Sequence, residues 1–522
     1  MQLSENPMTP RLRTKVKASE ELNFDPENAR KNKNLAFFYQ FEDLKVDLTR
    51  SFIPEETLSD LIALANNADV SQKIKMLFNG DKINSSENLA VEHQNQRSPE
   101  RFRSKEWRYL ENFVTNIRAN QNYKSIINIG VGGSDLGVSA VCDILKSYDD
   151  EPYLHFLSNL DTSILRHILY KCDPRTTLVV VSSKSFETLE SLRNADLVRE
   201  WLKAEKVDYK KSMIAVTAYP EKAVAWGISS EFVFNFPKTV GGRFSVWSAI
   251  GLPLALGLGV TRFKEFLAGG HAMDKHLKDT ELSKNIPVLL ALLRIWNRNF
   301  RGFNSHVLLP YQTTLKKFIS WSQQLEMESN GKTVDRNGNP LKMAAAPLIW
   351  GDVGTNWQHS FGQFLMQGVD VCPIDFLYAR NSIKGENEYG YELNHKINLS
   401  NLLGQANALA LGNSDRTNSH KNCEGRRPST IISWSENNPY AIGRLFALYE
   451  HITIVCGFIW DVNSFDQWGV QYGKALAQRI YKFKGSYFIG LMLSEKLAFQ
   501  LISQCKSIGW VYRKYQRQVC RP

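Results

Sequence analysis

From residue 125 onward the chain alternates between short apolar runs and longer stretches with helical periodicity. A strand that is buried on both faces of a parallel sheet is almost continuously apolar, whereas a surface helix repeats its apolar positions every three to four residues. Strands are predicted at 125–131, 153–159, 177–185 and 212–218, and again at 305–311, 347–352 and 370–377. Because helical stretches separate these strands, the pattern predicts an α/β fold with parallel, doubly wound sheets and helices on both faces.

The two series of strands predict two domains, with a further segment at each end of the chain. Residues 1–100 are polar and largely helical, and we expect them to pack on the larger domain. The first, smaller domain is predicted at 101–260 and the second, larger domain at 261–484. The remaining residues, 485–522, form a basic C-terminal tail, and the apolar stretch 451–465 is of uncertain type.

The composition is that of a globular protein with a large core. Of the 522 residues, 43% are hydrophobic and 22% are charged. The seven cysteines are scattered without a C-x-x-C pair, which argues against zinc ribbons and disulfide frameworks and favours a reducing compartment. The sequence starts without an apolar signal region, and the apolar run 249–260 is shorter than the roughly 20 residues of a membrane span. We therefore expect a cytoplasmic protein without a membrane segment.

The net charge of +11 raises the question of nucleic-acid binding. Nine basic residues and one acidic residue fall within 475–522, so the excess charge belongs mainly to the end of the chain. No zinc-finger, KH or RNP pattern accompanies this charge. The distribution favours a solvated tail over a nucleic-acid surface, although a contact surface stays an alternative.

The stretch IGVGGSDLG (129–137) joins a predicted strand to a predicted helix. Free backbone N–H groups at such a helix start favour an anion, and glycines allow close approach of a ligand. The stretch is not a dinucleotide fingerprint, because Asp135 stands where the third glycine is required, and Leu136 excludes a nucleophile elbow around Ser134. Ligand contact and a plain tight turn both remain open.

The stretch SSKSFETLES (182–191) also joins a strand to a helix and is rich in hydroxyl groups. Ser183, Lys184, Ser185 and Thr188 gather at the predicted helix start, where hydroxyls, N–H groups and an ammonium can surround phosphate oxygens. Without G-x-x-x-x-G-K-[ST], the stretch predicts a monophosphate site and not a nucleotide loop. The alternative is an ordinary helix cap by Ser185 and Thr188.

Three further positions have charges in unusual surroundings. Arg243 follows two glycines and precedes an apolar helix, so it is either an ordinary ion-pair residue or a residue that a ligand approaches. Glu326 and Glu328 are two apart and cannot share a helix face, so we expect one in solvent and the other directed into a site. A glutamate at the end of a helix opposes the helix dipole, and such a violation suggests function.

His359 and Lys474 complete the candidates from residue type and spacing. His359 follows a Gly-Thr-Asn turn, and a lone histidine is more often structural than functional. Lys474 follows a glycine at a predicted helix start. The helix dipole there opposes a cation, so the position is unfavourable unless an anion binds it.

These stretches, taken in order, resemble the glucose-6-phosphate isomerase (phosphoglucose isomerase) family. The resemblance covers roughly residues 100–482 and rests on IGVGGSDLG, SSKSFETLES, VGGRFSVWSAIGLPLAL, QQLEMESNGK, GTNWQHSF and FDQWGVQYGK. It implies two sugar-isomerase (SIS-type) domains and an aldose–ketose isomerase of glycolysis and gluconeogenesis that uses no metal or cofactor. A non-catalytic sugar-phosphate sensor on the same fold is the alternative.

The resemblance also implies a role for each candidate residue. Glu328 matches the base that moves a proton through a cis-enediol, and Arg243 matches the cation beside the enediolate. His359 and Lys474 match the pair that opens the sugar ring, with Glu190 orienting the histidine. The family is dimeric, with His359 supplied by the other subunit. Substrate contacts are expected from Gly133, Ser134, Ser183, Lys184, Ser185, Thr188 and Gln324.

Six residues depart from the family pattern. Ser185 and Ser191 stand where threonine is usual, which is a mild change, and the other four motivate the sensor alternative or leave a question open. Glu187 stands where threonine is usual and would weaken phosphate binding if it faced the phosphate. Trp357 replaces a glycine beside His359 and could crowd the site. Met366 stands in place of a histidine and Arg426 in place of an asparagine.

Overall fold

The computed structural model describes all residues except 27–36, 147–151, 382–389 and 483–522. Two compact units are defined by contacts along the chain, Met1–Asp466 and Gln467–Pro522. The first unit contains both sheets of the protein. The described part of the second unit is helix α19, Trp468–Lys482. Division of the first unit at residues 100 and 260 stays a prediction, and the predicted tail at 485–522 lies outside the described residues.

The first sheet has five parallel strands in the order β4-β3-β5-β6-β7. Its strands are β3 (Ser125–Ile129), β4 (Tyr153–Leu157), β5 (Thr177–Ser182), β6 (Met213–Thr217) and β7 (Val233–Asn235). The first four lie where apolar runs predict them. The short strand β7 was not predicted, because three residues carry too little pattern.

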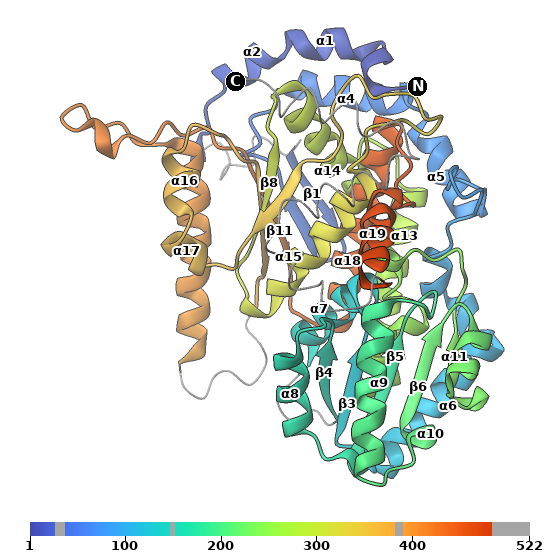
Figure 1. Ribbon diagram of the computed structural model, residues 1–522. Coiled ribbons are helices and arrows are strands. Elements are labelled where there is room, and N and C mark those ends of the chain that lie inside the picture. The colour runs from blue at the N-terminus through green and yellow to red at the C-terminus, as the bar shows by residue number, and fades with distance from the viewer. Residues whose placement is uncertain (27–36, 147–151, 382–389, 483–522) are drawn as a thin grey trace, which may run out of the picture. The chain divides into compact units, whose positions relative to one another are not determined.

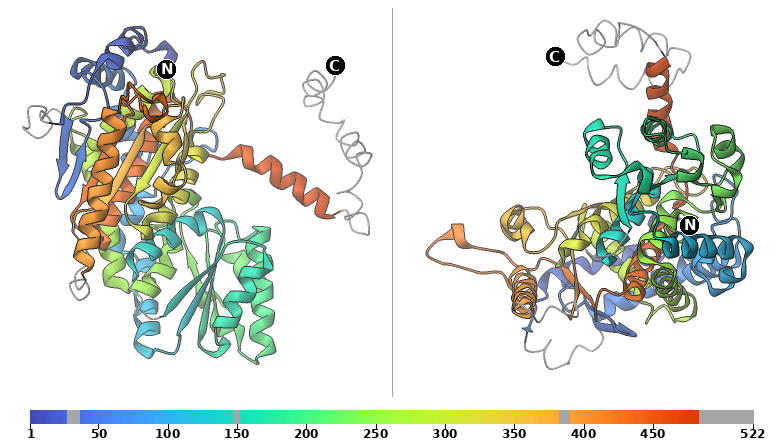
Figure 2. Two further views of the ribbon diagram at one scale, coloured as in Figure 1. Left: turned by 90° about the vertical axis from the view of Figure 1, so that its left-hand side faces the viewer. Right: turned by 90° about the horizontal axis from the view of Figure 1, so that it is seen from below.

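Both faces of this sheet are covered by helices, which explains its continuous apolar runs (Figures 1 and 2). Ile127 and Val179 pack in the core formed with α8 (Thr162–Lys171) and α9 (Leu189–Ala204). Their neighbours Ile126 and Val180 point to the other face and pack with α6 (Lys105–Asn120), α7 (Leu136–Leu145) and α12 (Leu252–Leu258). Successive side chains alternate between faces, so most positions of such a strand are apolar, and a buried polar residue such as Asn128 is hydrogen-bonded.

The second sheet has six strands in the order β1-β2-β11-β10-β8-β9. Strands β8 (Ser305–Pro310), β9 (Leu348–Gly351), β10 (Ile374–Ala379) and β11 (Ser429–Trp434) are parallel, and the first three were predicted. The hairpin β1 (Phe38–Phe41) and β2 (Leu44–Asp47) pairs antiparallel with β11. This hairpin joins residues of the helical 1–100 segment to the second sheet. The predicted α/β class with parallel, doubly wound sheets is confirmed.

Helix α18 (Pro439–Trp460) settles the uncertain stretch 451–465, which is helical up to Trp460. It packs against α13 (Val260–Asp279) and α14 (Ile286–Ile295). By length and composition α18 could cross a membrane, but all of its apolar window is buried inside the protein. Burial on every side, and not a lipid environment, accounts for its apolar character.

The first unit contains further α-helices among its described residues. They are α1 (Met8–Thr14), α2 (Val16–Glu21), α4 (Glu55–Asn67), α5 (Val70–Asn79), α10 (Tyr209–Ser212), α11 (Pro220–Trp226), α15 (Lys316–Gln323), α16 (Gly362–Gln367) and α17 (Tyr391–Leu411).

A buried cluster of ion pairs connects Arg97 to the helices α13 and α18. Arg97 donates to both oxygens of Asp274, at 2.8 and 2.6 Å, and forms an ion pair with Glu450. His451 and Trp247 bond to the same carboxylates, at 2.9 and 2.7 Å. Burial opposes ionisation of Asp274, but the Arg97 guanidinium and the His451 contact hold the pKa of Asp274 at about 2.

We expect Asp274→Asn to destabilise the fold by about 3–5 kcal/mol near neutral pH, because it leaves the buried Arg97 short of a partner. The folded pKa lies below the ordinary 3.8, so the ionised carboxylate stabilises the fold above about pH 4, and this contribution is lost as the pH falls toward 2. Urea unfolding of D274N and the unchanged protein should therefore differ less at low pH. The exposed Asp279 of the same helix provides the control D279N, and a gap that is independent of pH would contradict the expectation.

Candidate active site

The candidate site lies at the carboxyl ends of β3 and β5, the edge where open parallel sheets bind ligands. Hydrogen bonds of Asn128 connect the loop after β3 with the end of β5. The Ser182 hydroxyl donates to Asn128 Oδ1 at 2.8 Å, and Asn128 Nδ2 donates to the Ser134 carbonyl at 3.2 Å. Because Asn128 and Ser182 are buried, these hydrogen bonds fix the positions of the two loops relative to each other.

The glycine-rich loop after β3 is in backbone contact with the loop that carries Arg243. A Cβ atom on Gly133 would lie 2.1 Å from the carbonyl carbon of Gly242 and 2.7 Å from the nitrogen of Arg243. The hydroxyl of Ser245 donates to the Gly133 carbonyl at 3.2 Å. Glycine at 133 is therefore required by close approach of two backbones, which sets the distance between this loop and Arg243.

Arg243 is the central cation of the site and is 2% exposed. Its Nε donates to the Ser329 hydroxyl at 2.7 Å, and its Nη2 donates to the carbonyls of Ser464 and Asp466 at 2.6 and 3.1 Å. Its Nη1 lies 3.3 Å from Glu328 Oε2. Burial lowers the pKa of Arg243, and the carboxylates of Glu328 and Asp466 oppose that shift.

Glu328 ends a π-helical turn, Gln324–Glu328, that follows α15. Its carboxylate is 21% exposed and accepts a hydrogen bond from Gln324 Nε2 at 3.0 Å. Such turns occur frequently at functional sites, because the extra residue changes the direction of the following side chains. The predicted divergence of the two glutamates is confirmed, and Glu328 is the one beside Arg243.

The expectation that the other glutamate lies in solvent is wrong. Glu326 is 1% exposed and forms an ion pair with Arg294 at 2.8 Å. It also accepts from the Thr453 hydroxyl at 2.6 Å and from Asn330 Nδ2 at 3.0 Å. Arg294 and Thr453 come from other segments, and spacing within the motif cannot reveal these two partners.

The predicted phosphate loop lies between β5 and α9. Ser183 Oγ donates to Thr188 Oγ1 at 3.3 Å, and Ser185 Oγ accepts from the backbone N–H of Glu187 at 3.3 Å. Burial lowers the pKa of Lys184, and the nearby charge of Arg243 acts in the same direction. The carboxylate of Glu87 opposes this shift. The partly buried Lys184 and the fully buried Arg243 repel each other, and this repulsion favours binding of an anion near them.

Glu187 faces away from the loop's hydroxyl groups. Its carboxylate forms an ion pair with Lys222 of α11 at 2.7 Å and its side chain is 66% exposed. The added negative charge is therefore neutralised at the surface. The contact of Glu187 with the Ser185 hydroxyl is made by its backbone N–H, while its carboxylate is paired with Lys222.

The departures at Trp357, Met366 and Arg426 do not belong to the predicted phosphate loop. Trp357 is fully buried, donates from Nε1 to the Tyr311 hydroxyl at 3.3 Å and packs near Phe376. Met366 packs against the same apolar core. Arg426 adopts a positive φ of 53°, a conformation in which asparagine is common and which explains the usual residue there.

The expected grouping of His359, Glu190 and Lys474 has no bond within the described residues to support it in a single chain. His359 is exposed in the turn Asn356–His359, and within those residues its imidazole makes no hydrogen bond to Glu190. Lys474 belongs to α19, in the second unit. The expectation that Lys474 starts a helix is wrong, because α19 begins at Trp468 and Lys474 lies in its interior.

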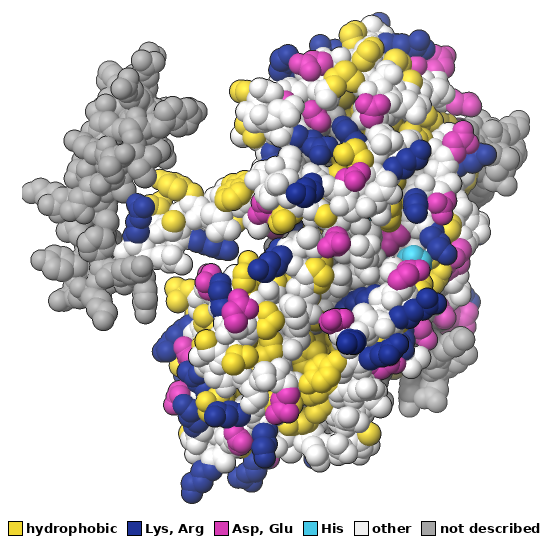
Figure 3. All heavy atoms as spheres, turned by 90° about the vertical axis from the view of Figure 1, so that its right-hand side faces the viewer, with side chains coloured by type: hydrophobic (Ala, Val, Ile, Leu, Met, Phe, Trp, Pro, Cys, Tyr) yellow, Lys and Arg dark blue, Asp and Glu magenta, His cyan; other side chains and the backbone are white. Residues whose placement is uncertain are grey.

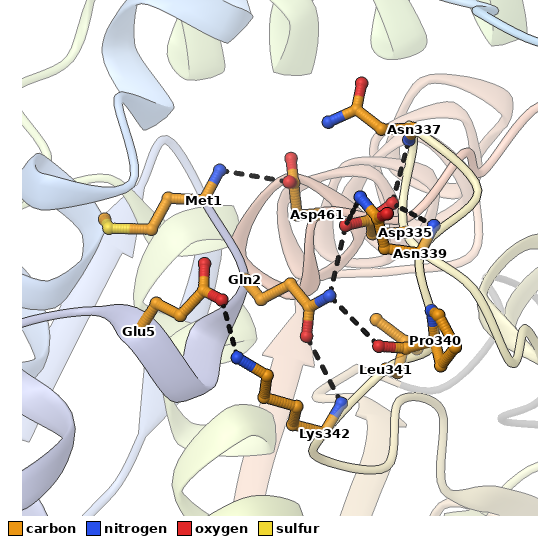
Figure 4. Close-up of a pocket in the computed structure, with 10 residues that line it drawn as sticks. All are labelled: Met1, Gln2, Glu5, Asp335, Asn337, Asn339, Pro340, Leu341, Lys342 and Asp461. Carbon is orange, nitrogen blue, oxygen red and sulfur yellow. Dashed lines mark hydrogen bonds and ion pairs between the residues drawn. The ribbon is translucent and has the colours of Figure 1, made fainter.

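A cavity of about 550 Å³ lies elsewhere, between Met1–Glu5 and residues 335–342 (Figure 4). Its polar groups bond to one another: Gln2 Nε2 donates to Asp335 at 3.1 Å, and Lys342 forms an ion pair with Glu5 at 2.9 Å. None of the predicted site residues lines this cavity.

Figure 3 shows acidic and basic side chains interspersed over one face of the molecule.

In the part of the chain that the structure describes, no three His, Cys, Asp or Glu side chains are grouped as metal ligands. The predicted absence of a metal or cofactor stays a prediction.

Fold and site together define an α/β protein in which a partly exposed carboxylate lies beside a buried arginine at the carboxyl edge of a parallel sheet. The chain belongs to the phosphoglucose isomerase family, whose model matches residues 47–487. The glucose-6-phosphate isomerase of Campylobacter jejuni subsp. doylei is 39% identical over 490 residues, covering 86% of this chain and 89% of that protein. The relative from Ectopseudomonas mendocina, also a glucose-6-phosphate isomerase, is 39% identical over 480 residues, 84% of this chain and 86% of its own.

Structural comparison agrees with the sequence relatives. The crystal structure of a glucose-6-phosphate isomerase from Chlamydia trachomatis matches with a TM-score of 0.84 and 29% identity, covering 96% of this chain and all of that one (100%). The prediction of the family from short motifs is confirmed.

The residues that hold Arg243 were not predicted from the sequence. Ser329 and Asn330 belong to the conspicuous ESNGK stretch, and Ser464 and Asp466 follow the apolar helix α18. The sequence signal for these residues was a cluster of polar side chains directly after a buried helix. It could not identify Arg243 as their partner, because Arg243 is more than 200 residues away from Ser464 in the chain.

We expect Gly133→Ala to lower kcat/KM by about tenfold or more, because the new methyl group would collide with backbone atoms that cannot move independently. Gly242→Ala is the matched control, since a Cβ there meets its nearest neighbour, Gly133 Cα, only at 3.8 Å. Steady-state kinetics of both variants tests the close approach. Equal effects of the two substitutions would refute it.

Proposed function

We propose that this protein interconverts glucose 6-phosphate and fructose 6-phosphate by proton transfer through a cis-enediol. The observation that carries the proposal is the Glu328–Arg243 pair, whose nearest atoms are 3.3 Å apart, in a chain that belongs to the phosphoglucose isomerase family. Glu328 is the base that moves the proton between C2 and C1 of the open sugar. Arg243 stabilises the negative charge that develops on the enediolate oxygen, because its own position is fixed before reaction.

Binding of the substrate phosphate is assigned to the loop between β5 and α9. Hydroxyl and N–H groups of this loop bond the phosphate oxygens, and the Lys184 ammonium supplies a compact positive charge. Gln324 lies between the Gly132 backbone and Glu328, which supports a contact close to both phosphate and base. The proposed substrate contacts are Gly133, Ser134, Ser183, Lys184, Ser185, Thr188 and Gln324.

Ring opening is assigned to His359 and Lys474, with Glu190 orienting the histidine. His359 is exposed in the single chain, and no hydrogen bond joins it to Glu190 within the described residues. Both observations are compatible with a homodimer in which the histidine of one subunit serves the site of its partner. We therefore include the homodimer in the proposal.

We further propose that the enzyme is cytoplasmic and requires no metal or cofactor. The five cysteines described are all free thiols, as expected in a reducing compartment. The sensor alternative loses its motivation, because Glu187 pairs with Lys222 and Trp357 lies in the core.

We expect Glu328→Gln to lower kcat by about 10³-fold or more while sugar phosphate still binds, because the amide cannot accept the proton. Fructose 6-phosphate formation from glucose 6-phosphate, with a chelator present, measures the effect. Glu187→Gln is the control, since that carboxylate faces Lys222, and its kcat should stay within about twofold. Near-normal turnover of E328Q would overturn the assignment of the base, and no turnover by the unchanged protein would overturn the proposed function.

A mixing experiment tests whether the site is shared between subunits. His359→Ala and Glu328→Gln should each be inactive as homodimers. Mixed dimers should recover part of the activity, because one of their two sites would combine an intact Glu328 with an intact His359 from the other chain. Absence of recovery, with mixed dimers demonstrated by mass, would show that the two residues act within one chain.

A further inference from the structure

The orientation of Arg243 depends on acceptors that belong to distant parts of the chain. Two of its contacts are backbone carbonyls, of Ser464 and Asp466, and one is the hydroxyl of Ser329. An arginine side chain has many rotamers, so a guanidinium is directed only if its acceptors are themselves immobile. What holds Ser464 in place therefore decides where the charge of Arg243 lies relative to Glu328.

Asn330 is the group that holds Ser464. The Ser464 hydroxyl donates to Asn330 Oδ1 at 2.7 Å. Asn330 is fully buried, and its Nδ2 donates to Glu326 Oε1 at 3.0 Å and to the Thr453 carbonyl at 2.9 Å. The amide thus has partners at both ends, which fixes the direction of its oxygen.

The far end of this chain of bonds is the buried ion pair of Glu326 and Arg294. Arg294 Nη1 lies 2.8 Å from Glu326 Oε2, and the hydroxyl of Thr453 donates to the same oxygen at 2.6 Å. Glu326 therefore cannot turn toward solvent or toward the cleft. The ion pair holds Glu326 in place, and Glu326 in turn fixes the position of the Asn330 side chain inside the core.

Gly457 of α18 leaves the space that this arrangement needs. A Cβ atom at Gly457 would lie 1.9 Å from Ser464 Oγ and 2.9 Å from Asn330 Oδ1. Any other residue would displace the hydroxyl from its acceptor. The backbone of a core helix is thus fitted to the Ser464–Asn330 bond.

We propose that Asn330 and Ser464 are positioning residues of the isomerase reaction, which direct the Arg243 guanidinium at Glu328 through the Ser464 carbonyl. The proposal rests on the proposed function. Neither residue touches the substrate; both act through Arg243. Their effect is on the step in which charge develops, because misdirected positive charge stabilises the enediolate less while ground-state binding by the phosphate loop is unchanged.

Ser464→Ala tests the proposal, since it removes one oxygen and keeps the carbonyl that accepts from Arg243. We expect kcat to fall by about tenfold or more and KM for glucose 6-phosphate to change by less than about threefold. Ser322→Ala is the matched control: Ser322 is also buried, in the helix α15 that leads to Glu328, and among the described residues its hydroxyl has no hydrogen-bond partner. Its kcat should stay within about twofold of the unchanged protein.

A double-mutant cycle separates positioning from a general loss of structure. In an Arg243→Ala background, Ser464→Ala should lower kcat by less than about twofold further, because the group that it positions is gone. An equal loss of kcat in both backgrounds would overturn the proposal. If Arg243→Ala does not fold, the kinetics of Ser464→Ala alone test the proposal. An unchanged kcat in this variant, or a fall in kcat/KM that is due entirely to a higher KM, would overturn the positioning role.

The outcome for the unchanged protein distinguishes the two proposals. Turnover by the unchanged protein, together with an unaltered kcat in S464A, overturns positioning alone. Absence of turnover in the unchanged protein overturns the isomerase function and, with it, the positioning role.

Discussion

Burial of the Arg243 guanidinium is the constraint on which the arrangement of the site depends. A buried cation is stable only if every N–H direction meets an acceptor, because an unpaired charge in the interior costs several kcal/mol. The acceptors come from the turn after α15 and from the segment after α18, while Arg243 itself lies between β7 and β8 in the sequence. The cleft is therefore complete only when these segments have docked, so the same contacts that satisfy the charge also form the site.

The surroundings of this cation contain several local departures from regular structure. A π-helical turn ends at Glu328, the backbone at Phe186 has a positive φ of 50°, and Gly133 touches another backbone. Each is unfavourable when considered alone and is tolerated because buried hydrogen bonds such as those of Asn128 hold the neighbouring loops. These departures bring the Glu328 carboxylate and the Arg243 guanidinium to within 3.3 Å of each other.

Residues that differ from the usual family pattern are accommodated on sides of the chain that do not face the cleft. Trp357 extends the apolar core of the second sheet, and its neighbour His359 remains exposed. Glu187 is neutralised by Lys222 at the surface. Side chains of one turn point in different directions, so a residue that is adjacent in sequence to a candidate site residue can lie in the core, as Trp357 does beside the exposed His359.

The sequence alone determined the α/β class, seven of the strands and the family, because strands buried on both faces leave continuous apolar runs and because short glycine-rich motifs survive as fixed strings. It also determined that Glu326 and Glu328 diverge, since that follows from helical geometry. Tertiary structure decided which glutamate faces the site: the ion pair with Arg294 requires a partner 32 residues away, and no local pattern records such a partner. Likewise β1 and β2 are half-exposed strands, and the pairing of β2 with β11, nearly 400 residues later, exists only after the chain has folded. Local sequence specifies local geometry, whereas contacts between distant segments depend on the packing of the whole unit, and the orientation of Arg243 is of that second kind.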